Sequence, residues 1–356
     1  ARSFTRPPWL GEQAGGLAMV AGRALLRHGA WPGKGHIVEG SMAQTGILQD
    51  KLVTLFGGSG FVGAHVAQAL LARGARVRIA SRTPEKAWKL KPLANLGQLQ
   101  FAPCDIRNEQ AVRQACEGAH AVVNLVGAFG GDMKGLMGIA AGRIAHAART
   151  VDAAALVHVS AIGADPESDS GYAQAKALGE RCVREGFPGA TVVRPSIVFG
   201  EGDNFINMFA RLIRAFPVLP VFGPDAPIQP LHVDDLAEAL ARAVENPALH
   251  GGKTYELGGP TILTMLEMHR SIATAQRRGR ALVPMPDTAS AAFAMLPGSP
   301  MSTDQWLLLK QGNIASGSQP GFAALGIAPR PLDLFLDRWM ERYRKHGRFT
   351  GRAGIA

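Results

Sequence analysis

Short apolar runs alternate with helix-like stretches along the chain from Lys51 onward. The run Leu52–Phe56 has the length and apolar character of a buried strand, and a glycine-rich turn and an alanine-rich helix ending at Gly74 follow it. Polar and apolar positions alternate over Arg76–Ala80, which predicts a second strand. Four more strands, separated by helical stretches, are predicted at Leu99–Phe101, Ala121–Val126, Leu156–Ser160 and Thr191–Val193. These strand–helix–strand units predict an α/β fold with a doubly wound parallel sheet.

The pattern changes after Pro195, where loops and prolines become frequent. A helix over Asp234–Val244, a strand over Lys253–Leu257 and a helix over Thr264–Ala275 are still predicted. We therefore expect a smaller C-terminal lobe over the open end of the sheet. The expected divisions are a basic N-terminal extension (1–46), a dinucleotide-binding domain (47–250, of which 203–232 contribute to the smaller lobe), the smaller lobe (251–330) and a basic amphipathic tail (331–356).

The composition excludes several classes of protein. Apolar residues make up 47% and charged residues 19% of the chain, which is typical of a folded globular protein and not of a disordered one. The three cysteines are too few for a disulfide framework or a cysteine-based zinc site, and the isolated histidines predict no metal site. A transmembrane helix needs a run of about 18 apolar residues, which the chain lacks.

The chain is basic, with 38 Lys and Arg against 28 Asp and Glu, so an anionic partner is expected. The basic, acid-poor residues 1–46 are typical of an organellar targeting segment or a docking arm; an extension without function is the alternative. The basic tail contains Trp339 and Tyr343 and is expected to lie on an anionic membrane surface, to dock on a partner, or to stay solvated. We find no nucleic-acid-binding module.

The sharpest chemical signal lies between the first strand and the first helix, where three glycines have the spacing G-x-x-G-x-x-G. Glycines there allow a tight turn and the close approach of a pyrophosphate, to which a helix N-terminus offers N–H donors and partial positive charge. We therefore predict a Rossmann-type dinucleotide site, with a turn that only packs as the alternative. The expected contacts from this turn are Gly57, Ser59, Gly60, Phe61, Val62 and Gly63.

The residues after the second strand indicate which dinucleotide binds. A site for NAD places an acidic residue about 20 positions after the glycines. This chain has Ser81 and Arg82 there, and no acid between Gly63 and Glu85. A guanidinium suits a 2′-phosphate because it donates charge-assisted hydrogen bonds. NADP(H) is therefore favoured over NAD, and a solvated cation is the alternative role for Arg82.

Tyr172 and Lys176 form the second signal, because residues four apart share one face of a helix. A nearby ammonium, together with the nicotinamide ribose that it would hold, lowers the pKa of a phenol from about 10 toward the working range. Tyr172 is thus a candidate acid that protonates a carbonyl while hydride arrives from the cofactor, with Lys176 as its support. Ser160 lies 12 residues before Tyr172 and is the candidate third member, although Ala161 and Ile162 occupy the next positions. A surface Tyr–Lys pair is the alternative.

Together these motifs resemble the short-chain dehydrogenase/reductase superfamily, in its extended or atypical branch, over about residues 51–275. The resemblance implies that Asp105 contacts the adenine. It also implies that Ser160, Tyr172 and Lys176 contact the cofactor. Its further implied cofactor contacts are Ile106 after the third strand, Leu125, Val126 and Gly127 after the fourth, and Pro195, Ser196 and Ile197 near the nicotinamide.

A closer resemblance is carried by segments such as Phe199–Asn207 and Tyr255–Pro260 and covers most of residues 51–349. These segments are similar to the nucleotide-binding accessory subunits of respiratory complex I, including their alphaproteobacterial relatives. The resemblance implies a tightly held, structural NADPH, other complex I subunits as partners, and a peripheral position near the membrane. The expected location is the matrix side of the mitochondrial inner membrane, or alternatively the cytoplasmic face of a bacterial membrane.

Three hypotheses follow for the function. The first is an NADPH-holding accessory subunit of complex I without turnover of its own. The second is a free-standing NADP(H)-dependent reductase or epimerase that uses Tyr172 and Lys176. The third is a sensor of the NADPH redox state that signals through assembly. Binding is better supported than turnover, because the smaller lobe shows no cluster of polar residues that would orient a substrate.

Overall fold

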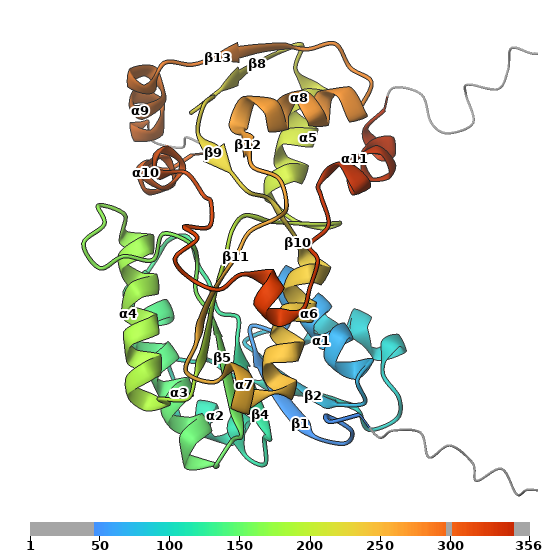
Figure 1. The fold of residues 1–356 in the computed structure, drawn as a ribbon, viewed down its shortest axis with the longest axis vertical. Coiled ribbons are helices and arrows are strands. Elements are labelled where there is room, and N and C mark those ends of the chain that lie inside the picture. The colour runs from blue at the N-terminus through green and yellow to red at the C-terminus, as the bar shows by residue number, and fades with distance from the viewer. Residues whose placement is uncertain (1–45, 297–300, 345–356) are drawn as a thin grey trace, which may run out of the picture. The chain divides into compact units, whose positions relative to one another are not determined.

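The computed structural model describes residues 46–296 and 301–344. Its centre is a seven-stranded sheet with the order β11-β6-β5-β4-β1-β2-β3, in which every neighbouring pair is parallel. The predicted doubly wound α/β fold is confirmed (Figure 1). The strands are β1 (Leu52–Phe56), β2 (Arg76–Ser81), β3 (Leu99–Pro103), β4 (Ala121–Asn124), β5 (Ala155–Val159), β6 (Thr191–Pro195) and β11 (Thr254–Leu257).

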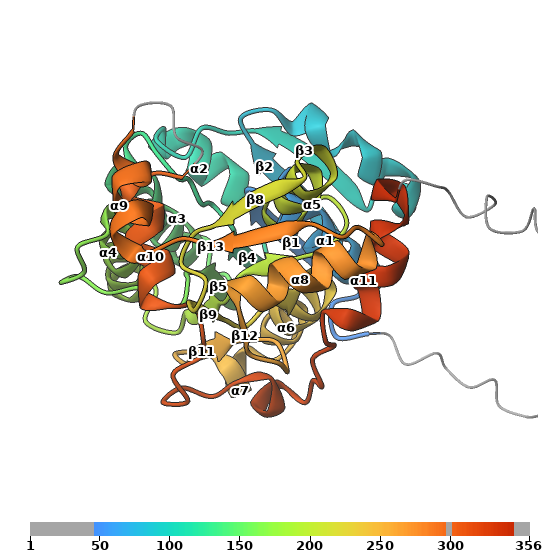
Figure 2. The same ribbon diagram turned by 90° about the horizontal axis from the view of Figure 1, so that it is seen from above.

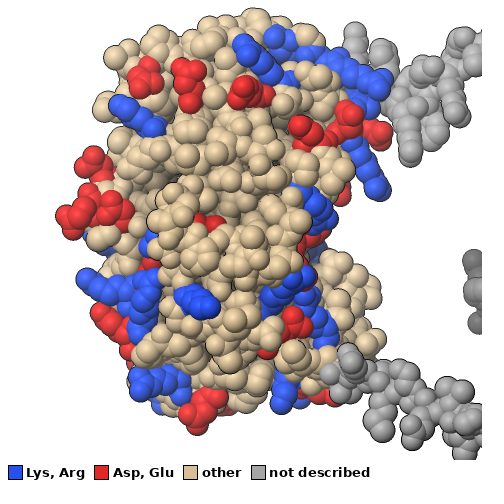
Figure 3. Space-filling view, in the orientation of Figure 1, with Lys and Arg blue, Asp and Glu red and all other residues tan. Residues whose placement is uncertain are grey.

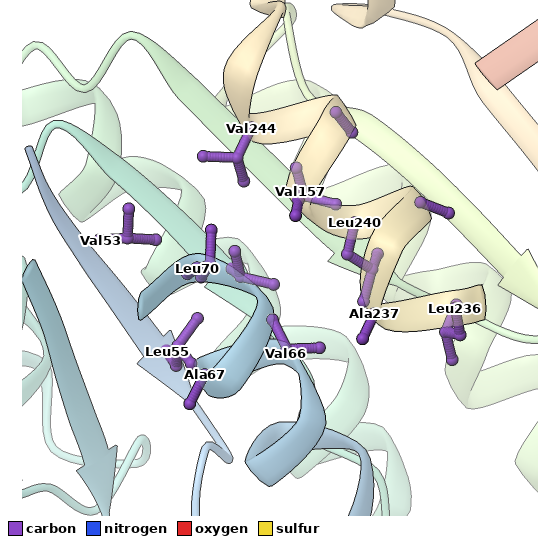
Figure 4. Close-up of a cluster of buried hydrophobic side chains, with 14 of the residues drawn as sticks. Val53, Leu55, Val66, Ala67, Leu70, Val157, Leu236, Ala237, Leu240 and Val244 are labelled. Carbon is purple, nitrogen blue, oxygen red and sulfur yellow. The ribbon is translucent and has the colours of Figure 1, made fainter. Parts of the chain in front are cut away.

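Helices cover both faces of this sheet because alternate strand residues point to opposite sides. On one face, Val53 and Leu55 of β1 pack against α1 and α6 (Figure 4). On the other face, Phe56 and Val122 pack against α2, α3 and α4. The helices of this part are α1 (Phe61–Leu71), α2 (Glu109–Cys116), α3 (Ala140–Thr150), α4 (Gly171–Gly186), α6 (Val233–Glu245) and α7 (Pro247–His250).

Two connections differ from the predicted regular helices. The segment between β2 and β3 forms the 3-10 helix η1 (Pro84–Leu93); Pro92 inside it has no backbone N–H to donate to a continuous α-helix. A π-helical stretch, η2 (Lys134–Ile139), precedes α3. The strand β11 belongs to the central sheet, although its residues fall in the segment expected for the smaller lobe; its apolar residues complete the sheet beside β6.

The smaller lobe lies over the carboxyl edge of the sheet (Figures 1 and 2). Its core joins Phe199 and α5 to α8, and Leu336 of α11 and Tyr343 pack into the same core. The boundaries of the predicted domains stay a prediction. The remaining elements are β7 (Val198–Phe199), α5 (Phe205–Ala215), β8 (Val218–Val221), β9 (Pro227–Ile228), β10 (Leu231–His232), β12 (Leu263–Thr264), α8 (Met265–Ala275), β13 (Ala281–Pro284), α9 (Asp287–Met295), α10 (Thr303–Gln311), η3 (Phe322–Leu325), α11 (Asp333–Trp339) and η4 (Met340–Tyr343).

The described part of the predicted tail therefore packs against the lobe. Leu332, Leu336 and Tyr343 are buried there, whereas Leu334 is 64% exposed. The predicted extension 1–46 and the tail after residue 344 lie outside the described residues, apart from Gly46.

A buried ion pair connects α4 to the sheet. The Glu180 side chain is 3% exposed; its Oε1 accepts from Arg194 Nε at 2.7 Å and its Oε2 lies 3.3 Å from Arg184 Nη1. A carboxylate taken out of water in this way depends on its partners, so removal of one partner leaves an uncompensated buried charge.

Replacing Glu180 therefore tests how firmly α4, which carries Tyr172 and Lys176, is held. We expect Glu180→Ala to lower the free energy of unfolding by about 2 kcal/mol, because Arg194 loses two charge-assisted hydrogen bonds and keeps Glu256 as a partner. Glu185→Ala on the same helix is the control: its pair with Arg181 is exposed, so a change below about 0.5 kcal/mol is expected. Denaturant unfolding measures both, and equal losses would contradict the assignment.

Candidate functional site

The glycine turn joins β1 to α1 at the point where the strand order reverses, between β1 and β4. Gly57 has a φ of 79°, a conformation that favours glycine, and its carbonyl accepts from the Gly60 N–H at 3.1 Å. A Cβ on Gly63 would lie 2.6 Å from Gly58 Cα, so glycine is required for the helix to pack against the turn. Ser59, Phe61 and Val62 lie in this same turn and the start of α1.

The N-terminus of α1 is open. Gly60 is its N-cap, no side chain caps it, and its first turn contains no acidic residue. The first N–H groups of a helix have no partner within the helix, and they carry partial positive charge. The turn therefore offers N–H donors to an anion at the carboxyl edge of the sheet, where ligands bind in open α/β folds.

The predicted residues after β4 lie beside this turn. A Cβ on Gly57 would lie 3.2 Å from the carbonyl carbon of Leu125, which shows how closely the two loops approach. Asn124 fixes the β4 loop, because its Oδ1 accepts from the Val126 N–H at 3.1 Å. Gly127 faces the Lys176 ammonium, which would lie 3.9 Å from a Cβ at that position.

The residues predicted to contact the adenosine half of the cofactor lie near the other end of the turn. The hydroxyls of Ser59 and Ser81 are 2.7 Å apart, and Arg82 follows as an exposed cation. Asp105, the expected adenine contact, forms an ion pair with Arg107, whose Nη2 lies 2.5 Å from Asp105 Oδ2. The hydrogen bonds from Arg107 lower the pKa of Asp105 to about 2, so its carboxyl is ionised at neutral pH. Ile106 is buried beside this pair.

Lys176 lies buried at the opposite end of the site. It is 3% exposed, and its Nζ donates to the Val159 carbonyl at 3.0 Å. Burial lowers the pKa of Lys176 to about 8. The neighbouring Ser160 is also 3% exposed, and its hydroxyl has no hydrogen-bond partner among the described residues. A buried hydroxyl without a partner is rare, which fits a place for a bound ligand group.

The surroundings of Tyr172 differ from those expected from the sequence. Its ring stacks on Phe129, with centroids 4.3 Å apart, and its backbone N–H points to Asp304 Oδ1 at 3.5 Å. Burial, with a smaller effect of Asp304, raises the pKa of Tyr172 to about 12. This direction is opposite to the lowered phenol pKa expected from the sequence: burial is the largest cause, and the Lys176 ammonium lies 5.8 Å from the ring centroid.

The segment near the expected nicotinamide position is already in contact with the rest of the chain. The Ser196 hydroxyl donates to the Gln229 carbonyl at 2.5 Å, and the Ile197 N–H donates to Asn313 Oδ1 at 2.6 Å. The Pro195 carbonyl accepts from the Ile162 N–H at 3.1 Å. Sequence reasoning missed Phe129, Asp304 and Asn313, because no motif marks a lone aromatic residue in a loop or single polar residues far along the chain.

The residues fit a nicotinamide dinucleotide. The open helix end suits a pyrophosphate, and the unpartnered Ser160 hydroxyl suits a polar group of the ligand. Among the described residues, no group of three or more His, Cys, Asp or Glu is placed to hold a metal ion. Within residues 46–296 and 301–344, no helix has both the length and the hydropathy to cross a membrane.

Comparison with known proteins agrees with this geometry. Residues 53–258, which contain the glycine turn, Tyr172 and Lys176, match the NAD dependent epimerase/dehydratase family. The chain belongs to this family. The match supports a nicotinamide nucleotide cofactor.

Two relatives carry the name NADH dehydrogenase [ubiquinone] 1 alpha subcomplex subunit 9, mitochondrial. The protein of Dictyostelium discoideum is 34% identical over 233 residues, which cover 64% of this chain and 64% of that relative. The protein of Rattus norvegicus is 29% identical over 334 residues, which cover 90% of this chain and 86% of that relative. The predicted similarity to accessory subunits of complex I is thereby confirmed.

Solved structures share the fold. An NADPH-dependent quinone oxidoreductase of Escherichia coli, solved in complex with NADPH, superposes with a TM-score of 0.65 at 19% identity and covers 80% of this chain and 99% of that one. At this identity the likeness concerns the fold alone.

The glycine turn gives a direct test of the site. We expect Gly63→Ala to weaken the binding of NADH and NADPH about tenfold or more, because the added methyl displaces the backbone that should meet the pyrophosphate. Gly279→Ala is the control, since a Cβ there meets nothing within 4 Å. Fluorescence titration with each reduced nucleotide measures the effect. Unchanged binding by Gly63→Ala would place the nucleotide elsewhere.

Lys176 should leave a signature in the pH dependence of stability. Its pKa falls from 10.5 to about 8 in the folded protein, so the unfolded chain binds more protons between these values. The free energy of unfolding should therefore rise with pH across this window. We expect Lys176→Met to flatten that rise, measured by denaturant unfolding at several pH values. Parallel profiles of the two proteins would contradict the buried ammonium.

Proposed function

We propose that the chain is an accessory subunit of respiratory complex I that holds NADPH and does not turn it over. Its assignment to complex I is supported by the similarity to mitochondrial NADH dehydrogenase subunits, including the alignment over 90% of the chain with the rat protein. The observation that carries the proposal of binding without turnover is the stacking of the Tyr172 ring on Phe129, while the Tyr172 backbone N–H points to Asp304.

The site would hold NADPH from three sides. The N–H groups of the glycine turn and of the α1 N-terminus would bind the pyrophosphate. Ser81 and Arg82 would bind the 2′-phosphorylated ribose, since a serine and an arginine stand where an NAD site has an acid. Ser160 and Lys176 would bind the nicotinamide half. When bound, the cofactor supplies a hydride, but the protein offers no ready proton to accompany it.

The lack of a ready proton follows from the surroundings of Tyr172. The Phe129 ring covers one face of the phenol, and the raised pKa of about 12 disfavours release of its proton. Lys176 donates to the Val159 carbonyl, which directs its ammonium toward the backbone. A phenol that protonates a substrate carbonyl must become a phenolate, and this environment destabilises that form.

A tightly bound nucleotide would also stabilise the fold. A ligand that binds only the folded state contributes about 4 kcal/mol at a thousandfold excess over its dissociation constant. NADPH would connect the β1, β2 and β4 loops with α4, which packs against α10 of the smaller lobe through Asp304. The cofactor would thus act as a structural part of the subunit.

The proposed location is the matrix side of the mitochondrial inner membrane, at its surface. The mitochondrial relatives support the organelle. Basic side chains gather at the upper right of Figure 3, near α8 and α11, and would face an anionic lipid surface. Arg338, on α11, is one exposed cation of the described tail.

The test separates a bound structural cofactor from an enzyme. We expect Tyr172→Phe to retain NADPH and to assemble into complex I at the level of the unmodified protein, because the hydroxyl proton is not used. Tyr255→Phe, whose hydroxyl bonds His250 outside the site, is the control. Nucleotide content of the purified protein and complex I content on native gels are measured in cells that lack the endogenous chain. An NADPH-dependent reductase activity that Tyr172→Phe abolishes while assembly stays intact would establish the enzyme instead.

A further inference from the structure

Charged side chains gather where β2 and β3 end. These parallel strands are neighbours, with Ser81 paired to Pro103, so the residues that follow them emerge side by side. Neighbouring strands lie about 4.8 Å apart. Arg82 follows β2, and Asp105 follows β3. A ligand group placed beyond Ser81 would therefore also lie close to the loop that contains Asp105.

Arg107 is fixed in this loop by Asp105. Its Nε lies 3.0 Å from Asp105 Oδ1 and 3.1 Å from Oδ2, and its Nη2 lies 2.5 Å from Oδ2. The Arg107 backbone N–H also donates to Oδ1 at 3.0 Å, and Arg143 Nη1 donates to the Arg107 carbonyl at 3.1 Å. Both the backbone and the side chain of Arg107 are thus held, although the side chain is 61% exposed.

This arrangement leaves one edge of the guanidinium free. The Nε and Nη2 groups face Asp105, whereas Nη1 donates to no group among the residues that the structure describes. An arginine can bind a carboxylate with one edge and a phosphate with another, because it has five N–H donors in a rigid plane. Asp105 therefore orients the Arg107 side chain and leaves the N–H groups of Nη1 available to another acceptor.

The local charge favours an anion. Three guanidinium groups, of Arg82, Arg107 and Arg143, lie around this loop with the carboxylates of Asp105 and Asp132. Arg107, and to a smaller extent Arg82, lower the pKa of Asp105, so both cations act on the same carboxylate. Three guanidinium groups and two carboxylates leave one net positive charge, which favours a phosphate group at this loop.

We propose that Arg107 is a second ligand of the 2′-phosphate of NADPH, opposite Arg82, with Asp105 as its positioning residue. The inference rests on the proposed function in taking NADPH as the ligand. It assigns selection of the phosphorylated ribose to two arginines from neighbouring strand ends. Arg82 supplies one cation from β2, and Arg107 supplies the other from β3. The Asp105–Arg107 pair then has a role in addition to the expected contact of Asp105 with adenine.

The experiment compares Arg107→Gln with a matched control. Arg113→Gln removes the same charge from an arginine that is 60% exposed and paired with Glu109 at 3.1 Å on the neighbouring helix α2. Dissociation constants for NADPH and NADH are measured by fluorescence titration, with the folded state of each variant checked by circular dichroism. We expect Arg107→Gln to weaken NADPH binding about tenfold or more and NADH binding less than about twofold. Arg113→Gln should change neither.

Two results would overturn the assignment. Equal weakening of NADPH and NADH by Arg107→Gln would mean that Arg107 acts only through Asp105 on the adenine. Unchanged binding of both nucleotides would mean that the ion pair is a surface feature. Neither result would bear on whether the subunit assembles into complex I, which is measured separately. A failure of the unmodified protein to bind either nucleotide would instead contradict the proposed function itself.

Discussion

The proposed nucleotide site depends on one constraint: the N-terminus of α1 is uncapped and lies where the strand order of the sheet reverses. β2 and β3 extend the sheet to one side of β1, and β4, β5, β6 and β11 extend it to the other, so the helices that follow β1 and β4 pack on opposite faces of the sheet. The close approach of Gly57 to the Leu125 carbonyl and of Gly63 to Gly58 brings the start of α1 against the loops at the carboxyl edge of the sheet. No side chain caps the helix, so its N–H groups are available to an anion.

The two ends of the site are built differently, and this difference carries the function. At the adenosine end the side chains are polar, partly exposed and basic, which suits the recognition of a phosphorylated ribose. At the nicotinamide end the smaller lobe reaches in: Asp304 meets the start of α4, and Asn313 binds the Ile197 N–H. Under the proposed function, these contacts of the smaller lobe with α4 and with Ile197 favour retention of a cofactor over exchange of substrates.

Much of this site was predictable because it is encoded in local sequence. The glycine turn, Ser81–Arg82 and the Tyr172–Lys176 pair depend on strand ends and helix spacing, and the structure places all of them at the carboxyl edge of one sheet. The contacts of Phe129, Asp304 and Asn313 were not predictable, since they come from loops and a helix without a periodic signal, up to 132 residues away in the chain from their partner. The opposite direction of the pKa shift of Tyr172 has the same origin, because burial by distant segments is not visible in a four-residue spacing.

The most direct test of the central claim is the nucleotide content of the protein purified under native conditions. Denaturing the protein and separating the released nucleotides by chromatography, with detection by absorbance and fluorescence, identifies the dinucleotide and its amount. We expect about one NADPH per protein chain to remain bound through purification. Nucleotide-free protein that neither contains nor binds a dinucleotide, or protein that carries only NAD(H), would contradict it.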